Sequence, residues 1–263
     1  MNPSSHPTPT KKGRLAGRCA LVTGAGGPMG RAIALRFAAE GASLMLTDIS
    51  SARLEAAVKE TLARHPEVRV ASRRADVRLP EEIDAIRRTA DAELPPVDIL
   101  VNVVGGLRGE LYQSMFSIDP PRWDETMDLN LKGTLLLSQC FAAGMLERGY
   151  GRIVNFCSIA YGGEQGQSAY GAAKAAVASL TRSMALELAP HVNVNCVAPG
   201  LIETSVLERM DPKIVDGYRE ACALRRLGRA EEIAHVALFL ASEESSYVTG
   251  EIVRVSGGRW PSL

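Results

Sequence analysis

The chain has 263 residues, of which 46% are hydrophobic and 23% charged, and its 30 basic side chains balance its 30 acidic ones. These fractions are typical of globular proteins and exclude a disordered, collagen-like or coiled-coil chain. A net charge of zero and an aromatic content of 5% argue against a nucleic-acid partner. The sequence contains no run of 18 consecutive apolar residues and therefore predicts no transmembrane helix. We expect a soluble cytoplasmic protein without membrane contact.

The cysteines and histidines narrow the class further. The five cysteines are widely spaced and form no C-x-x-C pair, which excludes a disulfide framework and a zinc ribbon and is typical of a reducing compartment. The four histidines lack the spacing of metal ligands, so no bound metal is expected.

Short apolar runs alternate with helical stretches along most of the chain. Residues 1–17, rich in proline, serine and basic side chains, are predicted to be a disordered tail, and residues 18–263 a single domain. Strand-then-helix alternation indicates an α/β fold, a doubly wound sheet of about seven parallel strands with helices on both faces. The expected strands are 19–23, 43–47, 68–71, 97–102, 151–157, 192–197 and 252–255. The expected helices are 29–40, 52–64, 81–93, 121–148, 168–188 and 230–241.

A glycine-rich turn joins the first predicted strand to the first predicted helix. It reads TGAGGPMG from Thr23 to Gly30. Glycines let the backbone approach a pyrophosphate closely, and the unpaired N–H groups of a helix N-terminus attract the anion. Glycines also serve ordinary tight turns. The position after the first strand of an alternating chain favours a dinucleotide site.

An acidic residue, Asp48, ends the second predicted strand, and Ile49 follows it. A carboxylate at this place can accept hydrogen bonds from the ribose hydroxyls and would repel a 2′-phosphate. No basic residue follows Asp48 directly, so NAD is favoured over NADP. A second interpretation, compatible with the first, makes Asp48 the N-cap of the next helix.

Tyr170 and Lys174 lie four residues apart in a predicted helix and therefore share one face. A phenol with a pKa of about 10 is a poor base at neutral pH, and a neighbouring ammonium group can lower that pKa. On most helices such a pair is simply a solvated face. Ser158, however, ends the fifth predicted strand, at the sheet edge where open α/β proteins bind ligands.

Taken in order, these motifs resemble those of the short-chain dehydrogenase/reductase family, in its compact subgroup of about 250 residues with one Rossmann-type domain. The resemblance covers nearly everything from Arg18 to Gly258. Four further segments match the family. Asp76-Val77 resembles the pair that contacts adenine, and Asn102-Val103-Val104-Gly105 the segment after the fourth strand. Asn130 resembles the fourth-helix asparagine, and 195–204 the segment that closes over nicotinamide.

The resemblance implies a role for each site residue. Tyr170 would be the acid/base, and Ser158 would position and polarise the substrate oxygen. Lys174 would lower the pKa of Tyr170 and bind the nicotinamide ribose, and Asn130 would hold a water that links Lys174 to solvent. The turn and the resemblance together give the expected cofactor-binding residues: Gly24, Gly26, Gly27, Met29, Gly30, Asp48, Asp76, Val77, Asn102, Tyr170, Lys174, Ile202 and Thr204.

The chain also departs from the family pattern. Pro28 stands where the family usually has a glycine; it lacks an N–H, although proline suits the first position of a helix. Substrate contacts are expected in 106–117, 159–168 and 203–224. Their polar side chains could suit a hydroxylated or acidic substrate, or could simply face water: Arg108, Glu110, Tyr112, Tyr161, Glu164, Gln165 and Gln167.

We therefore predict an NAD(H)-dependent oxidoreductase that interconverts a secondary alcohol and a ketone. Two alternatives remain open. One is an NADP-dependent 3-oxoacyl-thioester reductase of the same family, and the other is a non-catalytic dinucleotide-sensing protein. The family resemblance, together with the small residues on the Tyr170 helix, also predicts a homotetramer or homodimer.

Overall fold

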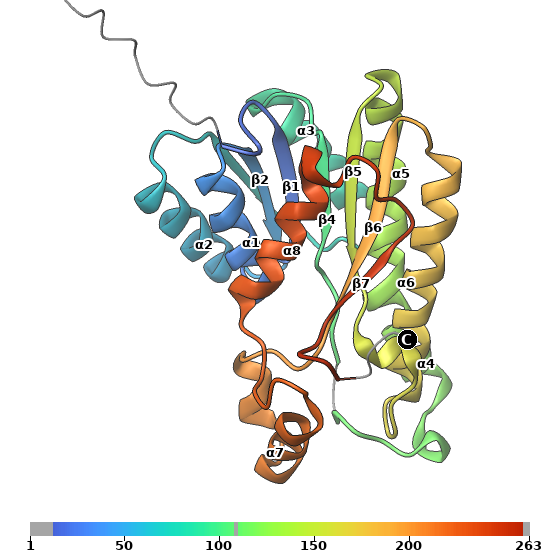
Figure 1. The fold of residues 1–263 in the computed structure, drawn as a ribbon. Coiled ribbons are helices and arrows are strands. Elements are labelled where there is room, and N and C mark those ends of the chain that lie inside the picture. The colour runs from blue at the N-terminus through green and yellow to red at the C-terminus, as the bar shows by residue number, and fades with distance from the viewer. Residues whose placement is uncertain (1–12, 108–109, 260–263) are drawn as a thin grey trace, which may run out of the picture.

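A computed structural model describes residues 13–107 and 110–259 of the chain (Figure 1). Its seven strands form one sheet in the order β3-β2-β1-β4-β5-β6-β7, and every neighbouring pair is parallel. The strands are β1 Cys19–Thr23, β2 Ser43–Asp48, β3 Val70–Arg74, β4 Ile99–Asn102, β5 Gly151–Phe156, β6 Val192–Pro199 and β7 Ile252–Val255. The predicted α/β fold is confirmed.

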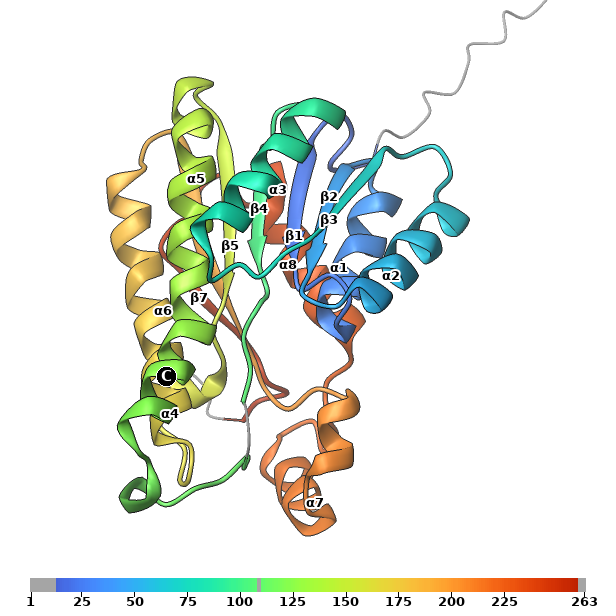
Figure 2. The ribbon, with the colours of Figure 1, turned by 180° about the vertical axis from the view of Figure 1, so that it is seen from behind.

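Helices cover both faces of the sheet (Figures 1 and 2). The core of one face includes side chains of α1, α2 and α8, and the core of the other includes side chains of α3, α5 and α6. Strands β1, β4 and β5 are buried at every position, as continuous apolar runs in a parallel sheet should be. The helices are α1 Pro28–Ala39, α2 Ser51–Arg64, α3 Pro80–Glu93, α4 Pro120–Met127, α5 Gly133–Glu147, α6 Ser168–Glu187, α7 Pro212–Ala221 and α8 Ala230–Ala241.

Three segments differ clearly from the predicted secondary structure. The helix expected over 121–148 is α4 and α5 joined by a π-helical turn, Asp128–Lys132. The strand expected over 68–71 is β3, which runs on through three exposed residues because it is an edge strand paired only with β2. Helix α7 was expected as part of a substrate loop.

The predicted tail is also too long. Leu15 is only 1% exposed, and its N–H donates to the carbonyl of Glu40 at 3.0 Å. Arg14 forms ion pairs with Glu40 and with Glu244, so it ties the start of the ordered chain to the ends of α1 and α8. Residues 1–12 of the predicted tail lie outside the described part of the chain.

Two further findings concern the described residues as a whole. No helix among them is long and apolar enough to span a bilayer. They also contain no group of three or more His, Cys, Asp or Glu side chains that could hold a metal ion.

A buried chain of polar side chains joins the two central strands to α6. Asn102 Nδ2, on β4, donates to Asn155 Oδ1, on β5, at 2.9 Å. Asn155 Nδ2 donates in turn to Thr181 Oγ1, on α6, at 2.9 Å, and Thr181 donates to the Val177 carbonyl. Both Asn155 and Thr181 have no exposed surface, so each bond is formed away from water. The chain fixes α6 against the middle of the sheet.

Replacing Thr181 by alanine should lower the free energy of unfolding by about 1–3 kcal/mol, because Asn155 Nδ2 would lose its partner in a buried place. Thr89 is a matched control, since its hydroxyl also donates to the carbonyl four residues earlier but lies only partly buried. Thr89→Ala should cost less than about 0.5 kcal/mol. Urea unfolding followed by circular dichroism measures both, and equal losses would contradict the role of Thr181.

Candidate active site

Two adjoining cavities open at the carboxyl edge of the sheet, next to β1 and β4, where the strand order reverses. Open α/β sheets bind ligands at such a switch point. One, the β2 cavity, is about 370 Å³ and lies between the glycine turn and the ends of β2 and β3. The other, the tyrosine cavity, is about 240 Å³ and contains Ser158, Tyr170 and Lys174. The two share five lining residues: Met29, Val103, Gly105, Gly106 and Leu107.

The glycine turn has the geometry of an anion cradle. A Cβ on Gly30 would lie 2.2 Å from the carbonyl oxygen of Gly24, so only glycine allows this close approach. Helix α1 begins at Pro28, and its N-cap Gly27 supplies no side-chain cap. The first backbone N–H groups of the helix therefore belong to Met29 and Gly30, which line the β2 cavity. This arrangement fits a pyrophosphate. The helix begins at Pro28, one residue before the expected start, and proline suits this first helical position.

Asp48 lies at the end of β2 and is 5% exposed. Its carboxylate accepts hydrogen bonds from the Gly26 N–H at 3.0 Å, the Ser50 N–H at 2.9 Å and the Arg53 guanidinium at 2.9 Å. The N-cap of α2 is Ser50, so the interpretation of Asp48 as the N-cap is wrong. Asp48 instead holds the glycine turn against β2, and Arg53 is a cation in the cavity that the sequence did not suggest.

The second acidic position of the β2 cavity is Asp76, which binds the Arg78 guanidinium through both of its oxygens. This hydrogen-bonded pair lowers the pKa of Asp76. Val77 is buried, 4% exposed, and also lines the cavity. Asn102, by contrast, lines neither cavity: its side chain belongs to the polar chain of the central strands, so the structure does not bring this predicted residue to the site.

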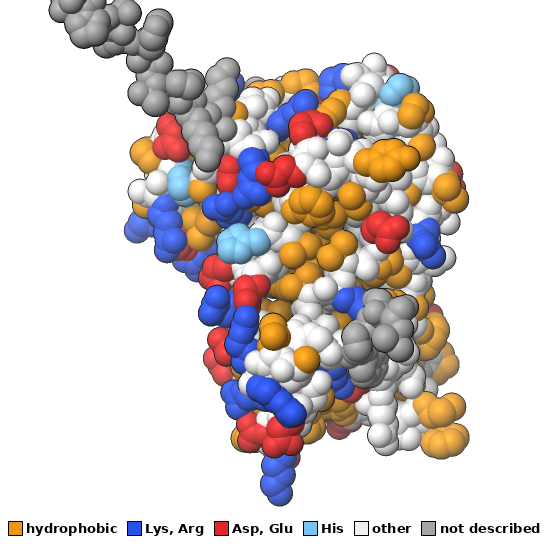
Figure 3. All heavy atoms as spheres, viewed as in Figure 1, with side chains coloured by type: hydrophobic (Ala, Val, Ile, Leu, Met, Phe, Trp, Pro, Cys, Tyr) orange, Lys and Arg blue, Asp and Glu red, His pale blue; other side chains and the backbone are white. Residues whose placement is uncertain are grey.

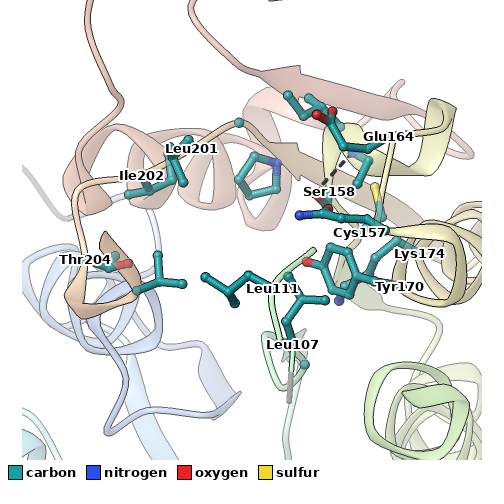
Figure 4. A pocket seen from close by; sticks show the side chains of 18 of the residues that line it. Leu107, Leu111, Cys157, Ser158, Glu164, Tyr170, Lys174, Leu201, Ile202 and Thr204 are labelled. Atoms are coloured by element: carbon teal, nitrogen blue, oxygen red, sulfur yellow. Dashed lines mark hydrogen bonds between the residues drawn. The ribbon is translucent and has the colours of Figure 1, made fainter. Parts of the chain in front are cut away.

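Ser158 and Tyr170 face each other across one wall of the tyrosine cavity (Figure 4). Ser158 directly follows Cys157 after β5 and is the N-cap of a 3-10 turn, where its Oγ accepts from the Ala160 N–H at 3.2 Å. Tyr170 lies in the first turn of α6, where it is half-buried beside Ser158. The resemblance placed these two hydroxyls together, and the structure does so.

Desolvation in the cavity raises the pKa of Tyr170 to about 12, while the hydrogen bond with Ser158 acts in the lowering direction. The expected lowering by Lys174 is not found. Its ammonium nitrogen lies 5.8 Å from the centroid of the Tyr170 ring and donates elsewhere, to the Phe156 carbonyl at 3.0 Å. Burial also lowers the pKa of Lys174, which is 3% exposed.

Lys174 and Asn130 meet at one glycine. A Cβ on Gly105 would lie 2.6 Å from Lys174 Nζ and 2.7 Å from Asn130 Oδ1. Asn130 sits in the π-helical turn, where its Oδ1 accepts from the Gly106 N–H at 2.8 Å and its Nδ2 donates to the carbonyls of Gly106 and Thr126 at 3.0 Å. The extra residue of the π-turn thus brings this amide to the loop after β4.

The opposite wall of the tyrosine cavity comes from the segment after β6. Figure 4 shows Leu201, Ile202 and Thr204 there, with Leu107 and Leu111 between the two walls. Ile202 is held by a bridge to Gly228. Both predicted residues, Ile202 and Thr204, therefore lie at the cavity.

The lining of the tyrosine cavity is more apolar than the sequence suggested. Its apolar residues outnumber its polar ones and include Leu107, Leu111, Ile159, Leu201, Val206 and Met210. Of the polar residues expected to meet a substrate, Tyr112, Glu164 and Gln167 line the cavity, whereas the Tyr161 hydroxyl accepts from Arg254 outside it. Arg108 lies outside the described residues.

Tyr218 of α7 lines the cavity; it lies in the segment 203–224, where substrate contacts were expected, but the sequence reasoning did not single it out. A signal for its helix was present, because Asp211 followed by Pro212 is a typical N-cap and first helical residue. The Asp211 side chain does accept from the Lys213 N–H at 2.8 Å.

The chain matches known proteins over almost its full length. The family model described as enoyl-(acyl carrier protein) reductase matches residues 24–259. A hydroxy(phenyl)methylsuccinyl-CoA dehydrogenase subunit of Thauera aromatica is 39% identical, over 93% of this chain and 97% of that protein. A 3-oxoacyl-[acyl-carrier-protein] reductase of Aquifex aeolicus is 38% identical, over 93% of this chain and 98% of that protein.

Solved structures agree with these relatives. A 7α-hydroxysteroid dehydrogenase in complex with NADH and a 7-oxo bile acid superposes with a TM-score of 0.88 at 35% identity, over 93% of this chain and 95% of that one. The β2 cavity has the glycine cradle that a dinucleotide requires, and the tyrosine cavity has the paired hydroxyls. The chain is therefore a member of the short-chain dehydrogenase/reductase family, oxidoreductases that act on a CH–OH group with a nicotinamide dinucleotide.

Proposed function

We propose that this chain is an NAD(H)-dependent dehydrogenase that interconverts a secondary alcohol and a ketone, with Tyr170 as the acid/base. The observation that carries the proposal is that Ser158 and Tyr170 face each other in an apolar cavity that adjoins the glycine cradle. When bound, the dinucleotide supplies the hydride-transfer chemistry. Gly24, Gly27, Met29 and Gly30 would hold its pyrophosphate.

The side chains of the tyrosine cavity account for the proton. In ketone reduction the Tyr170 phenol gives its proton to the substrate oxygen, and in alcohol oxidation its phenolate takes that proton back. Ser158 donates a hydrogen bond to the same oxygen and fixes its position between the two hydroxyls. The apolar wall excludes water, which keeps Tyr170 protonated in the free protein and suits it to the acid role in reduction.

Asp48 supports NAD as the cofactor, since its negative charge at the end of β2 would repel a 2′-phosphate. One observation favours the second candidate, an NADP-dependent reductase of a 3-oxoacyl thioester. Arg53 and Arg78 line the same cavity, and guanidinium groups bind phosphates well. Both arginines are paired with carboxylates, so we favour NAD.

The proposal includes the cytoplasm as the location and a homotetramer or homodimer as the assembly. All five cysteines are free thiols, as in a reducing compartment. Figure 3 shows hydrophobic side chains gathered over α8 and β7, while charged side chains crowd the end that carries α7. Strand β7 is an edge strand with half-buried residues, so a second copy could cover it.

Tyr170→Phe should lower kcat about 10²- to 10⁴-fold in both directions and leave the dinucleotide Kd unchanged. Ser158→Ala removes the hydrogen bond that acts to lower the pKa of Tyr170. Oxidation needs the phenolate, so the rising limb of its pH profile should move to higher pH. Reduction uses the phenol, so the limb of its profile that falls as the phenol ionises should move to higher pH as well. Steady-state rates over a pH series measure both, and full activity of Tyr170→Phe would refute the assigned role.

Gly105→Ala should lower kcat about tenfold to a hundredfold, because the added methyl would displace Lys174 Nζ from the Phe156 carbonyl or move Asn130. Gly217→Ala is the control, since a Cβ there meets no atom within 4 Å. Turnover at saturating cofactor is the measurement. Equal activity of the two variants would mean that the Lys174–Asn130 contact plays no part in catalysis.

Asp48→Ser should weaken the preference for NADH over NADPH at least about tenfold, because the charge that repels a 2′-phosphate is gone. Arg53→Ala separates the two candidates. It should change NADH binding less than about threefold under our proposal, and should weaken NADPH binding about tenfold if the chain uses NADP. Fluorescence titration of the unaltered protein and the two variants gives the six dissociation constants. Tighter binding of NADPH than of NADH by the unaltered protein would overturn the choice of NAD.

A further inference from the structure

A wall of four side chains closes the outer end of the tyrosine cavity. Tyr112, Glu164 and Tyr218 line this cavity and also a second, wider one of about 800 Å³ on its outer side, which we call the outer cavity. Arg259 lines the outer cavity. The four residues come from the loop after β4, the loop after β5, helix α7 and the segment after β7.

Contacts between these residues make the wall continuous. Arg259 Nη2 donates to both Glu164 oxygens, at 3.0 and 3.1 Å, and the two side chains are 12% and 13% exposed. The Arg259 guanidinium also stacks on the ring of Tyr218, 3.8 Å from its centroid. Tyr112 and Tyr218 are joined by a hydrogen bond of 3.2 Å between their hydroxyls. These side-chain contacts connect four separate segments of the chain.

The space inside the wall is small. The tyrosine cavity measures about 240 Å³, below the range of about 300–1,000 Å³ that is typical of ligand pockets. Under the proposed function, part of this volume beside Ile202 and Thr204 is taken by the cofactor. What remains is bounded by Leu107, Leu111 and the wall, and it suits an apolar substrate of few atoms.

We propose that Tyr112, Glu164, Tyr218 and Arg259 select the substrate by length: the wall admits secondary alcohols and ketones with short apolar chains and rejects longer ones. This inference rests on the proposed function for its reaction and concerns the substrate class of the same site. The ion pair gives the wall its firmness, because a longer chain would have to separate Glu164 from Arg259 where both are largely shielded from water. Removal of the wall would join the tyrosine cavity to the outer cavity.

The test is a series of 2-alkanones, from butanone to 2-dodecanone, reduced with saturating NADH. In the unaltered protein, kcat/KM should rise about fourfold for each added methylene while the chain still fits, and should then fall. In Tyr218→Ala and in Arg259→Ala the rise should continue to longer chains. The ratio of long-chain to short-chain kcat/KM should then increase at least about tenfold, mainly through KM.

Two variants serve as controls. Tyr218→Phe keeps the ring in the wall and should keep the length limit. Arg226→Ala removes a two-bond ion pair with Glu232 that lies outside the described cavities, and it should also keep the limit. Melting temperature and NADH affinity verify that each variant folds, and Arg259→Ala tests the wall independently if Tyr218→Ala is unstable. An unchanged length profile in a folded wall variant would overturn the inference.

A binding series separates this inference from the proposed function. Linear primary amides of the same lengths cannot be reduced at this site, so calorimetry measures their binding with or without NADH. Should no alkanone be turned over, the proposed function fails, and the amides still decide the inference. Long amides that bind the variants at least about tenfold more tightly than the unaltered protein support the wall, and equal affinities refute it.

Discussion

The hydrogen bonds of Asn155 are the constraint on which the candidate site depends. This residue joins β4, through Asn102, to α6, through Thr181. Thr181, Lys174 and Tyr170 lie along the same helix, so the contact that fixes Thr181 on the sheet also sets the depth at which the other two approach Ser158. The hydrogen bond from Lys174 to the Phe156 carbonyl is a second attachment of α6 to the sheet, nearer to Tyr170. A catalytic helix held at two points can position a phenol more accurately than a loop could.

Much of the architecture was predictable because its signals are local. Apolar runs buried on both faces marked the strands, and the order of motifs placed Ser158, Tyr170 and Lys174 together. The glycine turn was predictable for the same reason. Gly30 approaches Gly24 so closely that only glycine fits there, and the glycine is visible in the sequence. The error at Asn102 has a physical cause. An amide at a strand end can serve a ligand or the sheet, and here its burial assigns it to the sheet.

Features that arise from contacts between distant segments were not predictable. Leu15 is buried by neighbours far along the chain, and nothing in the polar sequence around it indicates this. The wall joins Arg259 to Glu164 across 95 residues. The pKa of Tyr170 follows from solvent exclusion in the assembled cavity, which outweighs the sequence expectation of a nearby ammonium group.

Pro28 acts on the unfolded chain as well as on the folded one. The resemblance led us to expect glycine at this place, and glycine loses more backbone entropy on folding than any other residue. A proline whose native φ suits its ring stabilises a protein by about 0.4–1 kcal/mol through the unfolded state. At the first position of α1 it sacrifices no N–H that the helix itself needs. The turn is thus partly ordered before any anion arrives, and less of the binding free energy is spent on immobilising it.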